Sequence, residues 1–454
     1  MKTKQLLTAL LALMLFAGCD KKAAEQPSKH VEWAYSSVIY ELNTRQFTPE
    51  GTFAAAAEQL PMLKELGVDI IWVMPMQPIG IKERKGSLGS YYAIRDYCAV
   101  NPEFGTEADF HAFVDKAHEL GMKVILDWVA NHTSPDHPWT NNPGWHYRDS
   151  LGNLTVQYDW TDISKLDYSN PDMRHAMLRS MRWWLDTFGI DGFRCDVASE
   201  IPTDFWNSTY DTLRMSYPNL FTLCEAEHPD SLLTLKAFDM YYGWELHHIM
   251  NDVAQGNKNV DSLWAYFAKA DTLFPEYAIR MNFTSNHDEN SWAGTAIERM
   301  GDAHYLFTAF TYFIPGMPLI YNGQESALNK RLRFFEKDTI AHNTDTPEFE
   351  LYRLLNHMRH NNKLMASPER GAKMYRLPCD NPNVFAAIRP CPCGKAIIGI
   401  FNMSADTQQA TILTRPEGYD GKLPDKYAAP NEEPVEIGAT YSINLPAWQW
   451  ILLQ

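Results

Sequence analysis

Cysteine, positive charge and long apolar runs are all scarce in this 454-residue sequence. Its 7 cysteines are too few for a scaffold held together by disulfides. Asp and Glu number 56 against 40 Lys and Arg, which gives a formal net charge of -16. Such a charge repels phosphate backbones and anionic lipid headgroups, so nucleic acid is excluded as an expected partner.

A marked apolar run, Leu6 to Phe16, stands near the N-terminus. A helix that crosses a bilayer needs roughly 20 apolar residues, so this run is too short to be one. Two lysines precede the run, and the small residues Ala17 and Gly18 stand directly before Cys19. This order is typical of a secretory signal with a cleavage site.

The same stretch resembles the lipobox of bacterial lipoproteins, with Phe16 where Leu is commoner. The resemblance implies a signal peptide over residues 1–18, a lipidated Cys19 and a polar tether over residues 19–34. The expected location is then the bacterial cell envelope, on the periplasmic side or the cell surface, with membrane contact through the lipid anchor only. A plain secretory signal with an incidental cysteine is the alternative.

Six cysteines follow Cys19, an even number whose pairing the sequence does not determine. Cys391 and Cys393 lack the two-residue spacer of a usual zinc or redox knuckle, and no His cluster accompanies them. We interpret them as loop or strand residues and leave a bridge open.

The overall composition is that of an average soluble protein, with 45% hydrophobic and 13% aromatic residues, enough to bury a large core. Short apolar runs alternate with amphipathic stretches, which is the pattern of βα units around a parallel sheet. Helix starts are clear at Thr52 and at Asn170, the residue before Pro171. Eight strands are predicted: Val38 to Leu42, Asp69 to Met74, Lys123 to Asp127, Gly192 to Val197, Phe221 to Glu225, Ala237 to Tyr241, Arg280 to Thr284 and Leu319 to Tyr321.

Two stretches depart from this pattern. Residues 133–170 are rich in Trp, Pro, Asn, Asp and Gly without a helical period, which indicates a small inserted domain after the third strand. Residues 368–454 contain short alternating strands, typical of a β-sandwich. The sequence therefore predicts the α/β class: a (β/α)8 TIM barrel over residues 35–367, with the inserted loop domain and a C-terminal β-sandwich.

Polar residues close four of the predicted strands. They stand in the segments Asp127 to His132, Arg194 to Asp196, Glu225 to Glu227 and Asn286 to Asp288. Chemistry in such a barrel takes place at the carboxyl ends of the strands, so these side chains are the first candidates for a site. One polar strand end alone is more often a cap than a catalyst, but several converging carboxylates repel one another and indicate a use.

Glycoside hydrolysis needs this combination, because it requires a carboxylate nucleophile and a carboxylic acid that donates a proton. Arg194 and Asp196 lie on the same side by the two-residue strand period, so we expect Arg194 to hold Asp196 ionised. Glu225 leaves an apolar strand and is the better candidate for a raised pKa, and hence for the proton donor. Glu227 points the same way by period two, and residue chemistry alone leaves the choice between the two open.

The ordered motifs resemble the α-amylase family of glycoside hydrolases over nearly the whole mature chain. They are Asp127 to His132, Gly192 to Asp196, the segment around Glu225, Phe283 to Asp288, Tyr92 to Tyr97, Asn101 to Thr106 and Ile320 to Glu325. The string Asp196-Val-Ala-Ser-Glu200 looks closer to the neopullulanase and cyclomaltodextrinase branch.

The resemblance implies a retaining mechanism with three catalytic residues: Asp196 as nucleophile, Glu225 as acid and then base, and Asp288 as stabiliser of the distorted sugar. It also decides between Glu225 and Glu227. Four residues would bind substrate, with Asp127 positioning a strand end beside them. Tyr92 would stack under the sugar, while His132, Arg194 and His287 would contact that sugar or the nucleophile.

The motifs depart from the family at two places. The Lys and His that follow the nucleophile in many α-amylases are Ser199 and Glu200 here, and the His-Gly before the stacking tyrosine is Ser90-Tyr91. Asn131 matches a calcium ligand of the family, but the His that helps this site is missing. Calcium is therefore an open expectation with unknown ligands, and no other cofactor is required.

The predicted function is hydrolysis of α-1,4-glucosidic bonds in starch-derived α-glucans or maltooligosaccharides. The alternatives are a transglycosylase or debranching enzyme of the same family, and a catalytically inactive glucan-binding lipoprotein. A metal-dependent barrel hydrolase is disfavoured, because only His132 and His287 stand at strand ends. Trp448 and Trp450 either bind glucan or pack against the barrel, and alternating aromatics in a terminal strand favour packing. The oligomeric state is not predicted.

Overall fold

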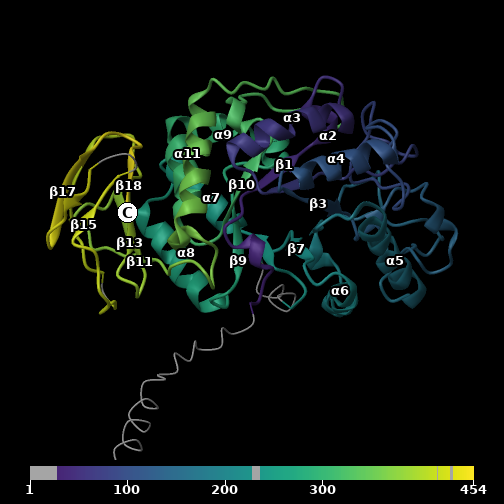
Figure 1. Ribbon diagram of the computed structural model, residues 1–454. Helices are drawn as coiled ribbons and strands as arrows, with labels where there is room; N and C mark the ends of the chain where they lie inside the picture. The colour runs from purple at the N-terminus through teal and green to yellow at the C-terminus, as the bar shows by residue number, and fades with distance from the viewer. Residues whose placement is uncertain (1–27, 228–235, 417, 430–432) are drawn as a thin grey trace, which may run out of the picture.

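The computed structural model in Figure 1 describes residues 28–227, 236–416, 418–429 and 433–454. Within these ranges eight parallel strands close into a barrel, in the order β1-β10-β9-β8-β7-β6-β3-β2. The predicted TIM barrel is thereby confirmed, whereas the signal peptide and Cys19 lie outside the described residues. The barrel strands are β1 (Ile39–Leu42), β2 (Ile70–Val73), β3 (Lys123–Trp128), β6 (Gly192–Cys195), β7 (Phe221–Cys224), β8 (Met240–Tyr242), β9 (Ile279–Asn282) and β10 (Met317–Tyr321).

All eight barrel strands differ from the sequence prediction by one to three residues at one or both ends. Strand β8 begins at Met240 rather than at Ala237, and β10 begins two residues before Leu319 because Pro318 pairs with Asn282 inside the ladder. Strand β9 ends at Asn282 rather than at Thr284, and the Asn282 side-chain amide donates to the carbonyl of Thr311 (3.2 Å). The residues that follow β9 therefore form a loop above the barrel.

Helices surround the barrel, and both predicted helix starts are confirmed. The Thr52 hydroxyl accepts a hydrogen bond from Ala55 N, and the Asn170 side chain accepts from Asp172 N and Met173 N. None of the helices within the described residues combines the length and apolar character that a bilayer-spanning segment needs. The α-helices are α2 (Thr44–Phe47), α3 (Phe53–Leu66), α4 (Glu107–Glu119), α5 (Pro171–Phe188), α6 (Thr203–Ser216), α7 (Trp244–Ala254), α8 (Val260–Leu273), α9 (Ala296–Met300), α10 (His304–Phe313) and α11 (Pro347–Asn361).

The insertion after β3 is tied back to the barrel by a short antiparallel pair. Strand β4 (His132–Thr133) pairs with β5 (Ser164–Lys165), and the chain between them contains the 3-10 helix η2 (Pro138–Asn141). This pairing places His132 beside Lys165 and brings the insertion over the carboxyl ends of the strands.

The C-terminal region consists of antiparallel sheets that lie beside the barrel, drawn in yellow in Figure 1. A buried apolar layer lies between the sheets, as in a sandwich. Phe385 packs the C-terminal region against the barrel. Its ring stacks on Trp264 of α8, with ring centroids 4.3 Å apart, and contacts Phe310 of α10, with centroids 5.0 Å apart. The strands are β11 (Tyr375–Arg376), β12 (Val384–Pro390), β13 (Ala396–Asn402), β14 (Gln408–Leu413), β15 (Lys426–Tyr427), β16 (Val435–Glu436), β17 (Thr440–Leu445) and β18 (Trp450–Leu453).

Two open points in this region are answered by the structure. Cys391 and Cys393 form a disulfide in the turn between β12 and β13, with their Cα atoms 5.1 Å apart. Trp448 and Trp450 are partly buried against the main core, as the packing interpretation predicts.

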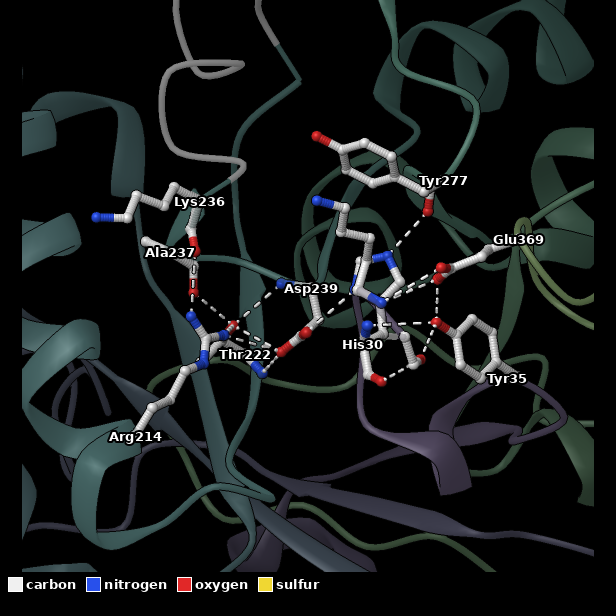
Figure 2. A network of polar contacts seen from close by, with 11 residues as sticks. His30, Tyr35, Arg214, Thr222, Lys236, Ala237, Asp239, Tyr277 and Glu369 are labelled. Carbon is white, nitrogen blue, oxygen red and sulfur yellow. Dashed lines mark hydrogen bonds and ion pairs between the residues drawn. The ribbon is translucent and has the colours of Figure 1, made fainter. Parts of the chain in front are cut away.

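The first described residues dock at the starts of the barrel strands. Figure 2 shows His30 reaching Asp239, which directly precedes β8; its Nδ1 lies 3.1 Å from Asp239 Oδ1. The other carboxylate oxygen accepts hydrogen bonds from Thr222 N (2.9 Å) and from Arg214 (3.2 Å). On the second side of the ring, His30 Nε2 lies 2.8 Å from the carbonyl of Tyr277. The N-terminal segment is thus fastened to the strand-start end of the barrel.

Candidate active site

Arg194 is the centre of the polar cluster at the carboxyl ends of the strands. It projects from β6 and is fully buried. One terminal nitrogen lies 2.8 Å from Asp127 Oδ1 and 3.0 Å from Asp196 Oδ1, and the other lies 2.9 Å from Glu225 Oε2. A single guanidinium therefore holds Asp196 and Glu225 close together, on neighbouring nitrogens. Its Nε also donates to the hydroxyl of Tyr242 (3.2 Å).

Val197 completes this arrangement through its backbone. It follows Asp196 with φ 36° and ψ 47°, a left-handed conformation that is costly for a β-branched residue. In this conformation its N–H donates to Glu225 Oε2 (2.9 Å). The strained turn after β6 thus joins the two candidate catalytic carboxyl groups.

Asp288 and His287 reach the same cluster from the loop after β9. His287 Nε2 lies 3.4 Å from Asp288 Oδ2 and 2.8 Å from the hydroxyl of Tyr92. The opposite ring nitrogen lies 2.5 Å from Oε1 of Glu41, a buried acid on β1. The Tyr92 ring also stacks against His287, with centroids 5.5 Å apart. These contacts with His287 orient Tyr92. The side chain of Asp288 remains 41% exposed.

All three predicted acids line one cleft of about 430 Å³. The predicted substrate-binding residues Tyr92, His132 and His287 line it as well, whereas Arg194 lies beneath it. Asp127 is buried below Tyr92, and it accepts hydrogen bonds from the Tyr92 hydroxyl (3.1 Å) and from Trp72 Nε1 (3.2 Å). The remaining lining residues are Lys85, Ser90, Asp159, Trp160, Asp162, Ile163, Val197, Trp292, Phe334 and Phe335.

The pKa order of the two central acids is opposite to the sequence prediction. Burial raises the pKa of Asp196 well above its ordinary range, and Glu225 adds to this, although Arg194 opposes it. Burial would also raise the pKa of Glu225, but Arg194 and the Val197 N–H outweigh it, so that pKa is lowered. The expectation of a raised pKa on Glu225 and an ionised Asp196 is therefore wrong for the free site. The expectation fails because Arg194 contacts both acids, and the sequence does not show its contact with Glu225.

The two histidines of the cleft differ in charge, because their pKa values shift in opposite directions. Burial alone would lower the pKa of His287, but Asp288 and Glu41 outweigh it and raise it to about 9. Burial lowers the pKa of His132 to about 3. At neutral pH the cleft thus contains one imidazolium, beside Asp288, and one neutral imidazole.

Glu227, the second candidate proton donor, does not reach the cleft. Strand β7 ends at Cys224, so the two-residue period that placed Glu225 and Glu227 on the same side does not apply beyond it. Glu227 Oε2 instead accepts a hydrogen bond from Glu245 N in the first turn of α7 (2.6 Å), and burial raises the pKa of Glu227 to about 7. The structure therefore favours Glu225, as the family resemblance does.

Some residues of the site were missed by the sequence analysis. Glu41 carried a signal, because it is a charged residue inside the apolar strand β1. Trp292, Phe334 and Phe335 lie on segments without a regular pattern, and only the fold brings them to the cleft. Trp292 is 57% exposed and contacts Phe334, with ring centroids 5.3 Å apart.

The residues around Asn131 do not fit a calcium ion, which binds to oxygen ligands. Asn131 Nδ2 donates to Gln157 Oε1 (2.7 Å), and Gln157 Nε2 donates to Glu200 Oε2 (2.9 Å). The ammonium group of Lys165 lies 3.8 Å from that carboxylate oxygen. N–H groups and an ammonium thus occupy the place where the family resemblance suggested a metal. Across the described ranges, no group of three or more His, Cys, Asp or Glu could hold a metal ion.

Comparison with protein families agrees with this geometry. The alpha-amylase family, through its catalytic domain, matches residues 23–143 and 140–349. The chain belongs to this family. It is 30% identical to the alpha-amylase MalA of Haloarcula japonica over 317 residues, and the aligned region covers 67% of this chain and 46% of that relative. The chain thus spans about half the length of that curated relative.

Two crystal structures of alpha-amylases are similar over almost the whole chain. One is a noncanonic maltogenic alpha-amylase, AmyB, from Thermotoga neapolitana, with a TM-score of 0.83, 29% identity and coverage of 92% of this chain and 98% of that one. The other is an alpha-amylase from Lactobacillus plantarum, with a TM-score of 0.80, 30% identity and the same coverage of both chains. The barrel, the insertion and the C-terminal sheets therefore belong to one architecture shared with these amylases.

Proposed function

We propose that the protein is a retaining glycoside hydrolase that cleaves α-1,4-glucosidic bonds in starch-derived α-glucans or maltooligosaccharides. One observation carries the proposal: Arg194 binds Asp196 and Glu225 through adjacent nitrogens, directly beside Asp288 in the cleft. Carboxyl groups held this close favour retention, because an inverting pair needs room for a water molecule between them.

In the proposed reaction the Asp196 carboxylate attacks the anomeric carbon while Glu225 gives its proton to the glycosidic oxygen, which leaves as a sugar hydroxyl. A water molecule then loses a proton to Glu225 and attacks the same carbon, and the Asp196 carboxylate is released. In the free site the charge on Glu225 raises the pKa of Asp196, so the pair favours keeping one proton on one of the two acids. Substrate binding must place that proton on Glu225, and Arg194 stabilises the ionised Asp196.

The other residues have roles that follow from their positions. Tyr92 offers its ring below the sugar, and the His287 imidazolium lies beside Asp288, the carboxylate that faces the positive charge developing on the sugar ring. Trp160 and Trp292 line the same cleft and offer flat apolar surfaces for further glucosyl units.

The anomeric configuration of the first product tests the proposal. Maltoheptaose is incubated with the protein, and proton NMR of the early products should show the α-anomer before mutarotation. Early β-anomer would contradict retention, and no turnover would favour the inactive glucan-binding alternative. Pullulan as a second substrate separates α-1,4 from α-1,6 cleavage, and longer products than the substrate would reveal transglycosylation.

We also propose that Cys19 is lipidated and holds the protein at the bacterial cell envelope. The support is the order of Lys2, the apolar run and Ala17-Gly18-Cys19, together with the docking of His30 at the strand-start end of the barrel. A tether that leaves from that end would leave the cleft facing away from the membrane. Incorporation of labelled palmitate, lost in Cys19→Ser, tests the anchor.

A further inference from the structure

A chain of hydrogen bonds runs from Glu200, after β6, to His132 in the cleft. Tyr158 donates to Glu200 Oε1 (2.9 Å), and Gln157 Nε2 donates to Glu200 Oε2 (2.9 Å). Gln157 Oε1 accepts from Asn131 Nδ2 (2.7 Å), and that same nitrogen lies 3.1 Å from His132 Nδ1. Gln157, Asn131 and His132 are all buried, so water does not compete for the two bonds among them, whereas Glu200 is exposed at the outer end of the chain.

The direction of donation along these hydrogen bonds follows from Glu200 alone. A carboxylate only accepts hydrogen bonds, so Gln157 must turn its NH2 group toward Glu200. Its carbonyl oxygen then faces Asn131, which must present its own NH2 group. That NH2 group donates to His132 Nδ1, which therefore carries no proton. The neutral His132 must bear its proton on Nε2.

His132 Nε2 is placed to use this proton on substrate. The atom is buried, His132 lines the cleft, and Nε2 has no hydrogen-bond partner among the residues that the structure describes. An unpartnered donor of this kind is costly to bury and is satisfied when a sugar hydroxyl arrives.

We propose that Glu200, acting through Gln157 and Asn131, is a positioning residue that holds His132 in its Nε2–H tautomer as a hydrogen-bond donor to the glucosyl ring at the cleavage site. The role as donor to substrate rests on the proposed function, whereas the tautomer does not. The relay joins the end of β3, the insertion and the segment after β6 through side-chain hydrogen bonds, at the position where the family resemblance suggested calcium.

A double substitution can reverse the relay without changing its shape. Asn131→Asp and Glu200→Gln each exchange one atom, and together they keep the number of acids the same. In the double variant the new amide at position 200 donates to Gln157, and Gln157 donates to the new carboxylate at position 131. That carboxylate then accepts a hydrogen bond from a protonated Nδ1 of His132, and Nε2 loses its proton.

Nitrogen-15 NMR of histidine-labelled protein, with His132 assigned through His132→Gln, distinguishes the two tautomers. We expect a protonated Nε2 in the wild type, a protonated Nδ1 in the double variant, and a mixture in Glu200→Gln alone. The double variant should melt near the wild-type temperature, while kcat/KM on maltoheptaose falls about tenfold. If the relay were merely structural, the double variant would recover both the melting temperature and kcat/KM. Tyr158→Phe is the matched control, because it removes a contact of Glu200 outside the relay and should leave the His132 spectrum unchanged.

Several results would overturn the relay. A proton on Nδ1 in the wild type would do so without any variant, and so would a double variant that folds but retains Nε2–H. Addition of calcium or of a chelator should leave the His132 spectrum and the melting temperature unchanged, and a calcium-dependent change would contradict the relay. If the wild type turns over no glucan, the proposed function fails, and the NMR measurement still decides the tautomer.

Discussion

The two ends of the barrel differ in how fully their buried charged groups are paired. At the strand-start end, Asp239 shares its two oxygens among His30, Thr222 and Arg214, as Figure 2 shows. At the other end, one Arg194 serves three acids, and buried atoms such as Glu41 Oε2 and His132 Nε2 have no partner among the described residues.

This difference separates stability from function. A paired buried carboxylate with several donors supports the fold, whereas crowded acids repel one another and lower the free energy of unfolding. In TIM barrels the strand-start end is the stabilising one and the carboxyl end carries the chemistry. Substitutions at the two ends should therefore change different quantities.

Asp196→Asn should have the largest effect. We expect kcat on maltoheptaose to fall at least about 1000-fold, because the nucleophile is lost. The melting temperature should stay the same or rise, since burial already opposes the charge on this carboxyl group. Steady-state kinetics and thermal unfolding measure the two quantities. Near-normal turnover in the folded variant would remove Asp196 from the mechanism.

Asp239→Ala should show the reverse pattern. It leaves the N–H groups of Thr222, Arg214 and His30 without their acceptor, so we expect a loss of about 4 kcal/mol in the free energy of unfolding. The kcat of the folded fraction should stay within about twofold of the wild type. Urea unfolding followed by turnover at low urea measures both. Asp115→Ala, which removes an exposed ion pair with His111, is the control and should change little.

The barrel and the three acids could be predicted because their signals are local. Apolar runs mark strands, Asp196 and Glu225 directly follow the ends of β6 and β7, and Asp288 stands in the loop after β9, at the end of the barrel where these side chains meet. The same rule failed for Glu227, because β7 ends at Cys224 and the chain turns away. Local patterns thus locate a strand end, but not the course of the chain after it.

The electrostatics could not be predicted, because they depend on which donors each acid meets. Arg194 was expected beside Asp196, and that contact is present. Its second contact, with Glu225, and the left-handed Val197 turn depend on the packing of β6 against β7. These contacts reverse the expected pKa order.

The carboxyl end of the barrel should also be the pH-sensitive one. His287 has a pKa of about 9 in the folded protein against an ordinary value of 6.5. A raised pKa stabilises the fold fully below about pH 6.5, and this stabilisation is lost as pH rises through about 9. We expect a loss of about 3 kcal/mol across this window. Urea unfolding at several pH values should show it in the wild type and not in His287→Gln. An equal loss in both proteins would assign the pH effect elsewhere.

Trp292→Ala should have the smallest effect. It tests how far the substrate-binding surface of the cleft extends. The side chain is 57% exposed, so little buried area is lost and the free energy of unfolding should hardly change. Because the indole lines the cleft beside Phe334 and Phe335, we expect KM for maltoheptaose to rise about fivefold at constant kcat. Met215→Ala, at an exposed apolar residue on α6, is the matched control. An unchanged KM would mean that the glucan chain leaves the cleft before it reaches Trp292, so that substrate contacts end near Tyr92 and Asp288.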